Sequence, residues 1–262
     1  MTTNKVATVN AAFWVMKICA TTLGETAGDL VSMTLEVGYA VSSIMLLSLF
    51  AVTLVAQLAS SRFHPLLYWT VILSTSTAGT TMSDYMDRTL RLGYTRGTII
   101  LVCCLLASLG VWRWREGTLS VSNIRTKRAE AFYWVTILFS NTLGTALGDF
   151  LADDSGLGFL GSAALIAGLL TLDLLAFWLT RANRVALFWI AFVLTRPFGA
   201  TFGDVLTKPH ERGGLDFGTI GSSLVLATLL FTYMYFTGGR QQAATAAGDS
   251  DSSNALPKPD AP

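Results

Sequence analysis

The sequence predicts an all-α integral membrane protein with about eight transmembrane helices, arranged as four parallel helical-hairpin repeats. Of the 262 residues, 52% are hydrophobic and only 13% are charged, and the mean hydropathy is +0.53. The apolar residues occur in runs of about 20, the length that a helix needs to cross a bilayer. A four-fold internal repeat is the second observation, and it indicates the architecture more directly than composition does.

Each copy of the repeat begins with an aromatic residue followed by tryptophan. A glycine lies ten residues after the tryptophan and an aspartate fifteen residues after it, without a gap in any copy. The tryptophans are Trp14, Trp69, Trp134 and Trp189, so successive copies are 55, 65 and 55 residues apart. The longer middle step favours two duplications, in which a unit was doubled and the pair was doubled again. The predicted parts are a membrane half at 1–114, a polar cytoplasmic linker at 115–129, a second half at 130–239 and a disordered tail at 240–262.

Two apolar segments make up each repeat. The first contains the tryptophan and the aspartate, and the second follows a turn in which glycine precedes an aromatic residue. The first segments carry Thr, Ser, Asn, Gly and charged residues, whereas the second are almost entirely apolar. Because polar groups are costly against lipid, we expect the odd-numbered helices at the centre and the even-numbered helices outside. The predicted helices are 11–33, 39–60, 65–87, 95–114, 130–152, 158–180, 185–206 and 217–237.

Basic residues are concentrated in one set of connections between these helices. Cytoplasmic loops carry an excess of Lys and Arg, so this set and both chain termini are expected in the cytoplasm. The opposite connections hold fewer basic residues, and they also hold Glu36, Asp153 and Asp154. Their basic residues are Arg88, Arg91, Arg96, Lys208 and Arg212. The residues of the expected cytoplasmic side are Lys5, Arg62, Arg113, Arg115, Arg125, Lys127, Arg128, Arg181, Arg184 and Arg240.

The second half of each odd-numbered helix reads Gly-x-x-x-(Gly/Ser)-Asp. Small residues four apart lie on one helix face and let two helix backbones approach closely. The aspartate borders that contact, so four such helices would gather their carboxylates near one axis. The expected packing glycines are Gly24, Gly28, Gly79, Gly144, Gly148, Gly199 and Gly203. The aspartates are Asp29, Asp84, Asp149 and Asp204.

A carboxylate cluster inside a membrane needs a counter-charge, which a cation, protons or basic side chains can supply. We therefore expect the four aspartates, with Glu25 of the first copy, to bind a hard cation or to relay protons. Lys17 and Arg196 lie in the same helices and are the expected charge partners. Two alternatives stay open. The aspartates would cap the next turn of backbone, or Glu25 would only be neutralised by Lys17 or Arg196.

The stretch KICATTLGETAGDLVSMTL (17–35) and its three weaker copies resemble a bacterial family of multi-spanning, membrane-anchored proteins. That family is defined by this repeat and has no assigned function. The resemblance covers nearly the whole chain except the tail, and it implies a multi-pass protein of the bacterial inner membrane.

The expected function is transport of a cation, with proton coupling as one form of it, and the alternative is a non-transporting scaffold or partner subunit. An intramembrane aspartyl protease would need a Gly-x-Gly-Asp motif and a Tyr-Asp partner motif, and the sequence contains neither. Asp84-Tyr85 has the two residues of the partner motif in the reverse order. We therefore expect no enzyme activity and no cofactor. The expected partners are the bilayer and an inorganic cation or protons, with no nucleic acid. The metal and the oligomeric state are not predicted.

Overall fold

The computed structural model describes residues 6–60, 63–121, 124 and 126–235. The tail expected at 240–262 lies outside these residues. So do part of the expected linker and four basic residues of the expected cytoplasmic side, namely Lys5, Arg62, Arg125 and Arg240.

The described residues form a bundle of long helices whose positions agree with the eight predicted segments. Three of the odd-numbered helices continue into a short π-helical turn directly after the repeat aspartate. The long helices are α1 (Ala11–Asp29), α2 (Tyr39–Ala59), α3 (Pro65–Asp84), α4 (Tyr94–Glu116), α5 (Lys127–Asp149), α6 (Gly158–Leu179), α7 (Arg184–Thr207) and an eighth helix (Gly218–Tyr235). The π-helical turns are η1 (Leu30–Thr34), η2 (Tyr85–Thr89) and η4 (Phe150–Asp154).

Local sequence signals start the odd-numbered helices. The side chains of Asn10, Thr126 and Asn183 cap α1, α5 and α7 by accepting hydrogen bonds from backbone N–H groups of the first turn. Helix α3 begins at Pro65, whose fixed backbone angle and missing N–H suit a first helical position. These signals start each of the four helices shortly before the aromatic pair of its repeat.

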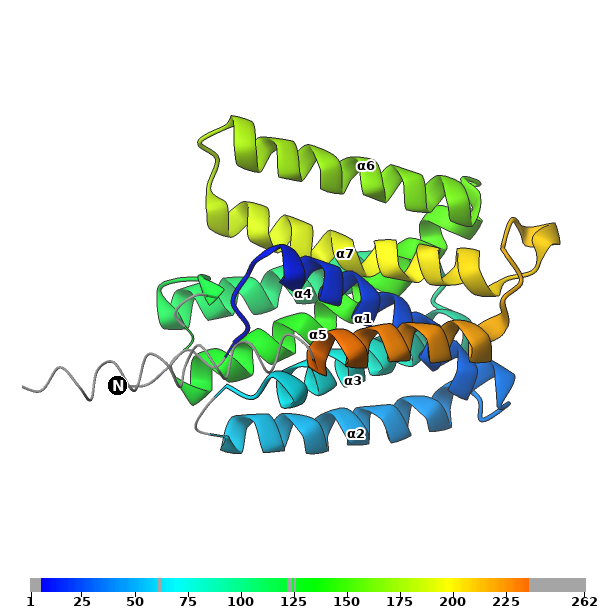
Figure 1. Cartoon of the computed structure of the whole chain (residues 1–262), viewed down its shortest axis with the longest axis horizontal. Helices are drawn as coiled ribbons and strands as arrows, with labels where there is room; N and C mark the ends of the chain where they lie inside the picture. The colour runs from blue at the N-terminus through cyan, green and yellow to red at the C-terminus, as the bar shows by residue number, and fades with distance from the viewer. Residues whose placement is uncertain (1–5, 61–62, 122–123, 125, 236–262) are drawn as a thin grey trace, which may run out of the picture.

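The odd-numbered helices form a closed ring at the centre of the bundle. Helix α1 packs against α3 and α7, and α5 packs against the same two helices from the other side. The even-numbered helices lie outside, with α2 along α3, α4 along α5 and α6 along α7 (Figure 1). The eighth helix lies on α1, where Ser223 contacts the Thr26 hydroxyl at 2.9 Å. Each outer helix thus packs on the central helix of the next repeat, and the last one returns to the first.

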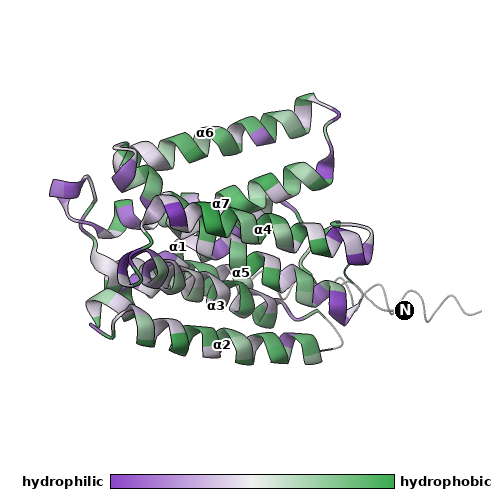
Figure 2. Cartoon of the chain, turned by 180° about the vertical axis from the view of Figure 1, so that it is seen from behind, coloured by the Kyte–Doolittle hydropathy of each residue, from purple (hydrophilic) through white to green (hydrophobic). Residues whose placement is uncertain are grey.

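Burial confirms that polar central helices are enclosed by apolar outer ones. In their most apolar windows, 67% of the α5 segment and 50% of α7 are buried, against 22–28% of α2, α4, α6 and the eighth helix. Hydrophobic residues extend along α2 and α6, whereas hydrophilic ones gather in connections and at helix ends (Figure 2). Such apolar outer faces suit lipid better than water.

Six of the described helices are long and apolar enough to cross a membrane. They are α2, α4, α5 with η4, α6, α7 and the eighth helix. Helices α1 and α3 have similar lengths but are rich in buried charged and hydroxyl side chains, which lowers their hydropathy. The fold therefore suggests a membrane protein, and α1 and α3, which are not among the six, belong to the central ring.

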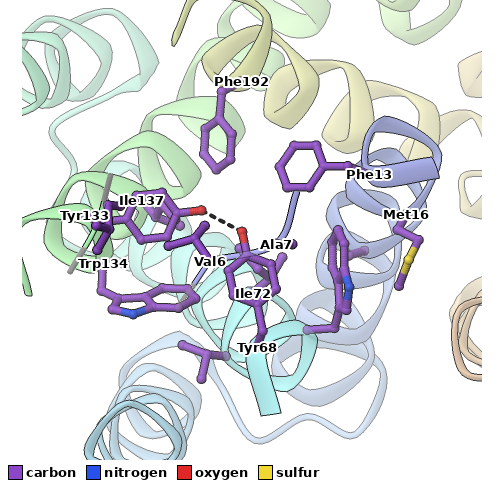
Figure 3. Close-up of a cluster of buried hydrophobic side chains, with 14 of the residues drawn as sticks. Val6, Ala7, Phe13, Met16, Tyr68, Ile72, Tyr133, Trp134, Ile137 and Phe192 are labelled. Atoms are coloured by element: carbon purple, nitrogen blue, oxygen red, sulfur yellow. Dashed lines mark hydrogen bonds between the residues drawn. The ribbon is translucent and has the colours of Figure 1, made fainter. Parts of the chain in front are cut away.

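Aromatic side chains close one end of the ring. Phe13, Tyr68 and Tyr133 are buried there, and the two tyrosine hydroxyls lie 2.6 Å apart (Figure 3). Val6 and Ala7 of the N-terminal segment are buried in the same cluster. The repeated aromatic position thus forms a packed layer rather than an exposed belt.

Candidate functional site

The ring stacks equivalent residues of the four repeats in layers. Four-residue steps along one helix keep side chains close to one face, so each step from the aromatic end adds a layer of four related residues. The first layer is Phe13, Tyr68, Tyr133 and Phe188, and the second is Lys17, Ile72, Ile137 and Phe192. The third is Thr21, Ser76, Asn141 and Arg196, and the fourth is Glu25, Thr80, Thr145 and Ala200. The fifth is Asp29, Asp84, Asp149 and Asp204.

The repeated glycines bring the four helices together, as the sequence predicts. An added Cβ at Gly24 would overlap Ser76, and one at Gly79 would meet the backbone between Asn141 and Thr142. The same relation joins Gly144 to Arg196 and Gly199 to Thr21, so every glycine faces the third layer of the next helix. The second set of small residues repeats this contact one turn further, with Gly28 against Thr80, Gly148 against Ala200 and Gly203 against Glu25.

The four repeat aspartates form a ring at the end opposite the aromatic layer, and each of them is at most 4% exposed. Two basic side chains bridge them in pairs. Arg88 contacts Asp84 at 3.0 Å and Asp149 at 3.3 Å. Lys208 contacts Asp29 at 2.8 Å and Asp204 at 3.1 Å. We call these six residues the aspartate ring, and it holds four carboxylates against two basic groups.

Three of the aspartates do not cap the turns that follow them. Asp29, Asp84 and Asp149 directly precede the π-helical turns, and their side chains make no capping hydrogen bond there. This observation contradicts the capping alternative for these three aspartates. Single π-helical turns are rare and occur often at functional sites, and here they follow the ring in three of four repeats.

Arg88 and Lys208 belong to the site although the sequence does not predict them there. The expected helices end at 87 and 206, so both residues fall in connections, and the expected counter-charges are Lys17 and Arg196. The available signal was spacing, because each basic residue follows its own aspartate by four residues and thus shares its helix face. Burial alone would lower the pKa of Lys208, but Asp204 and Asp29 outweigh it and hold that pKa above the ordinary lysine value.

Glu25 lies one layer deeper and pairs with Arg196. Arg196 Nη2 lies 3.0 Å from Glu25 Oε2, and both side chains are buried. Lys17 is fully buried but forms no ion pair among the described residues, and its ammonium lies 4.3 Å from the centre of the Phe192 ring. Of the two expected partners of Glu25, the structure therefore selects Arg196.

A pocket of about 230 Å³ opens over the aspartate ring. Its lining is both acidic and basic, and includes Asp149, Asp204, Arg88 and Lys208. Carboxylate oxygens of Glu25, Asp29 and Asp204 lie within 4.8 Å of one another, which makes them the group of the described chain best placed to share a cation. The structure thus brings all five expected carboxylates to one end of the central axis.

These features define an α-helical repeat protein with a polar centre and outer helices of membrane-spanning length. The chain belongs to the family described as "Repeat of Unknown Function (DUF347)", whose model matches residues 12–63, 67–118, 132–183 and 187–240. Each match covers one repeat, beginning beside its tryptophan. Neither a search of curated proteins nor a search of solved structures found a match to the chain.

Proposed function

We propose that the protein is a multi-pass protein of the bacterial inner membrane that transports a cation, with protons as the coupled or transported ion. In this proposal all eight helices cross the bilayer and both termini lie in the cytoplasm. The aromatic layer then faces the cytoplasm and the aspartate ring faces the periplasm. Apolar outer helices around a polar central ring support this placement.

One observation carries the transport proposal, namely the aspartate ring beneath an open pocket. Four buried carboxylates share two basic side chains, so the ring has spare negative charge for a cation or protons. The pocket gives ions a route from solvent to Asp149 and Asp204.

The second candidate is a scaffold or partner subunit that transports nothing. The closed aromatic end favours it, because Tyr68 and Tyr133 are fully buried and joined by a hydrogen bond. A transporter that alternates access must open this layer, whereas a scaffold keeps it packed in every state.

Flux into proteoliposomes tests the proposal. Monovalent and divalent cations are offered one at a time, with a pH dye inside, for wild type, Asp29→Asn, Asp204→Asn and the matched control Asp173→Asn on outer helix α6. We expect flux of at least one cation that is lost in both ring variants and kept in the control. If correctly folded wild type moves none of the cations, transport is excluded and the scaffold remains.

A further inference from the structure

The guanidinium of Arg196 lies in an oxygen cage built by three other helices. Its Nη2 atom lies 2.6 Å from Thr80 Oγ1, 2.7 Å from Thr145 Oγ1 and 3.0 Å from Glu25 Oε2. The backbone oxygen of Ser76 completes the cage at 3.4 Å. All four residues are at most 3% exposed, so the cage is enclosed within the ring.

This cage holds more oxygen than a guanidinium nitrogen can use. Nη2 carries two hydrogens and so can donate two good hydrogen bonds, but four oxygens surround it. Meanwhile Arg196 Nε and Nη1 have no hydrogen-bond partner within the described chain. Sites built for arginine usually engage the planar fork at two or more nitrogens. Here the surroundings converge on one point of positive charge instead.

The positions of the hydroxyl groups suit a cation at that point. Thr80 Oγ1 lies 3.2 Å and Thr145 Oγ1 3.1 Å from Glu25 Oε2, so each hydroxyl can donate to the carboxylate. Thr80 Oγ1 also lies 3.2 Å from the backbone oxygens of Gly24 and Ser76. A hydroxyl that donates to any of these oxygens leaves its lone pairs for Nη2. Hydroxyl, carboxylate and carbonyl oxygens are ligands of hard cations, and this set carries a single negative charge. With the guanidinium out of the cage, a monovalent cation neutralises that charge, whereas a divalent one would leave a buried excess of +1.

We propose that the cage of Glu25, Thr80, Thr145 and the Ser76 carbonyl is an alkali-cation site, which the Arg196 guanidinium occupies as a tethered substitute in the present conformation. An alkali ion entering the cage competes with Arg196 for Glu25, and the returning guanidinium expels it. The aspartate ring is the adjacent layer, so an ion passes from Asp29 or Asp204 directly to Glu25. The inference adds the class of cation to the proposed transport. Only the passage of the ion from the aspartate ring to Glu25 rests on the proposed function.

The repeats themselves suggest the variant that empties the cage. Arg196 occupies the place of Asn141 in the third repeat, so Arg196→Asn inserts a side chain that the fold already uses at an equivalent position. Thermal unfolding in detergent is compared in NaCl, KCl and choline chloride. We expect Na⁺ or K⁺ to raise the unfolding temperature of Arg196→Asn by about 3 °C or more over choline. Wild type and Arg196→Lys keep a tethered charge in the cage, so a rise in these two can come only from ions at the aspartate ring, and the rise in Arg196→Asn should exceed theirs.

The matched control is the double variant Arg196→Asn/Glu25→Gln, which removes the cage's charge and should lose the response to alkali ions. A folded Arg196→Asn that unfolds at the same temperature in all three salts would overturn the proposal. An Arg196→Asn that folds in none of them, while Arg196→Lys folds, would also overturn it, because an alkali ion should replace the missing charge. This binding readout is independent of flux. Stabilisation by alkali ions without flux in wild type rejects transport and supports the cage as an alkali-ion site. Flux without stabilisation supports transport and rejects the cage.

Discussion

The aspartate ring and the layer of Glu25 are adjacent in the same four helices, but the four repeats are identical in one and different in the other. The ring has the same residue in every copy, whereas the Glu25 layer has Glu, Thr, Thr and Ala. In the ring, two bases offset four carboxylates. Glu25 pairs with Arg196 alone, so four glutamates in its layer would leave a larger uncompensated charge.

The basic residues of the ring add an intermediate level of symmetry. Arg88 forms ion pairs with Asp84 of its own repeat and Asp149 of the third. Lys208 forms ion pairs with Asp204 of its own repeat and Asp29 of the first. The bases therefore belong to the second and fourth repeats, as expected if a pair of repeats was doubled. The aspartates have four-fold symmetry, their counter-charges two-fold symmetry, and the Glu25–Arg196 pair none.

The largest expected effect lies in the asymmetric layer. Arg196→Met leaves Glu25 buried without its counter-charge, so in choline chloride it should lower the free energy of unfolding by about 3–5 kcal/mol. The double variant Arg196→Met/Glu25→Gln should recover much of that loss. Equilibrium unfolding in mixed detergent micelles measures both. A double variant no more stable than the single one would contradict a pairwise role.

The next effect concerns the glycines that bring the layers together. Gly79→Ala places a methyl group against the backbone of Asn141 and Thr142, which cannot rotate away, so we expect a loss of about 1–3 kcal/mol. Gly148→Ala is the control, because its Cβ lies 3.2 Å from the small Ala200 side chain and should cost less. The same unfolding assay ranks the two. Equal losses would argue against close backbone contact as the reason for the glycines.

Within the aspartate ring, Lys208→Met should cost about 1–2 kcal/mol, less than the buried pair because solvent partly screens the ring. Arg88→Met should cost less again, because the Arg88 side chain is 32% exposed against 17% for Lys208. Equilibrium unfolding of both variants at the same salt concentration shows which substitution lowers the free energy of unfolding more. If Arg88→Met is the more damaging, exposure does not govern the strength of these bridges.

The pH dependence of the Lys208 bridge follows from its raised pKa. The stabilising charge is complete below the ordinary lysine pKa of about 10.4 and is lost only as the pH rises above it. The difference in unfolding temperature between wild type and Lys208→Arg should therefore stay constant from about pH 7 to pH 10 and widen at higher pH, because arginine keeps its charge. A difference that already changes near neutral pH would contradict the raised pKa.

The smallest effect lies in the turns beside the ring. Glu36 and Arg91 adopt positive φ angles of 55° and 58°, and Gly156 takes the corresponding place in the third repeat with φ 76°. Arg91→Gly should therefore be neutral or stabilise by at most about 1 kcal/mol, whereas Gly156→Ala should destabilise. In thermal unfolding, Gly156→Ala should therefore unfold at a lower temperature than wild type, and Arg91→Gly at the same or a higher one. An Arg91→Gly variant that loses as much as Gly156→Ala would contradict the role of the positive φ angle.

The sequence predicted the helices and the central position of the polar ones because the repeat aligns without gaps and its polarity alternates. The seven packing glycines and the convergence of five carboxylates followed from the same spacing. The ion pairs could not be predicted as firmly, since Glu25 could reach Lys17 or Arg196 until neighbouring helices fixed the layers. Arg88 and Lys208 were missed because they follow the repeat motif, where the expected helices were ending. The packing of α2 on α3 depends on contacts between repeats, which sequence periodicity does not contain.

That packing has a consequence for how the chain can be divided. The last helix of the first half, α4, covers α5 of the second, and the last helix of the second half covers α1 of the first. The halves thus exchange their outermost helices, as two partners in a swapped dimer do. Neither half can enclose its own polar face. Two fragments cut in the linker and produced together should therefore reassemble, while each fragment alone should be degraded.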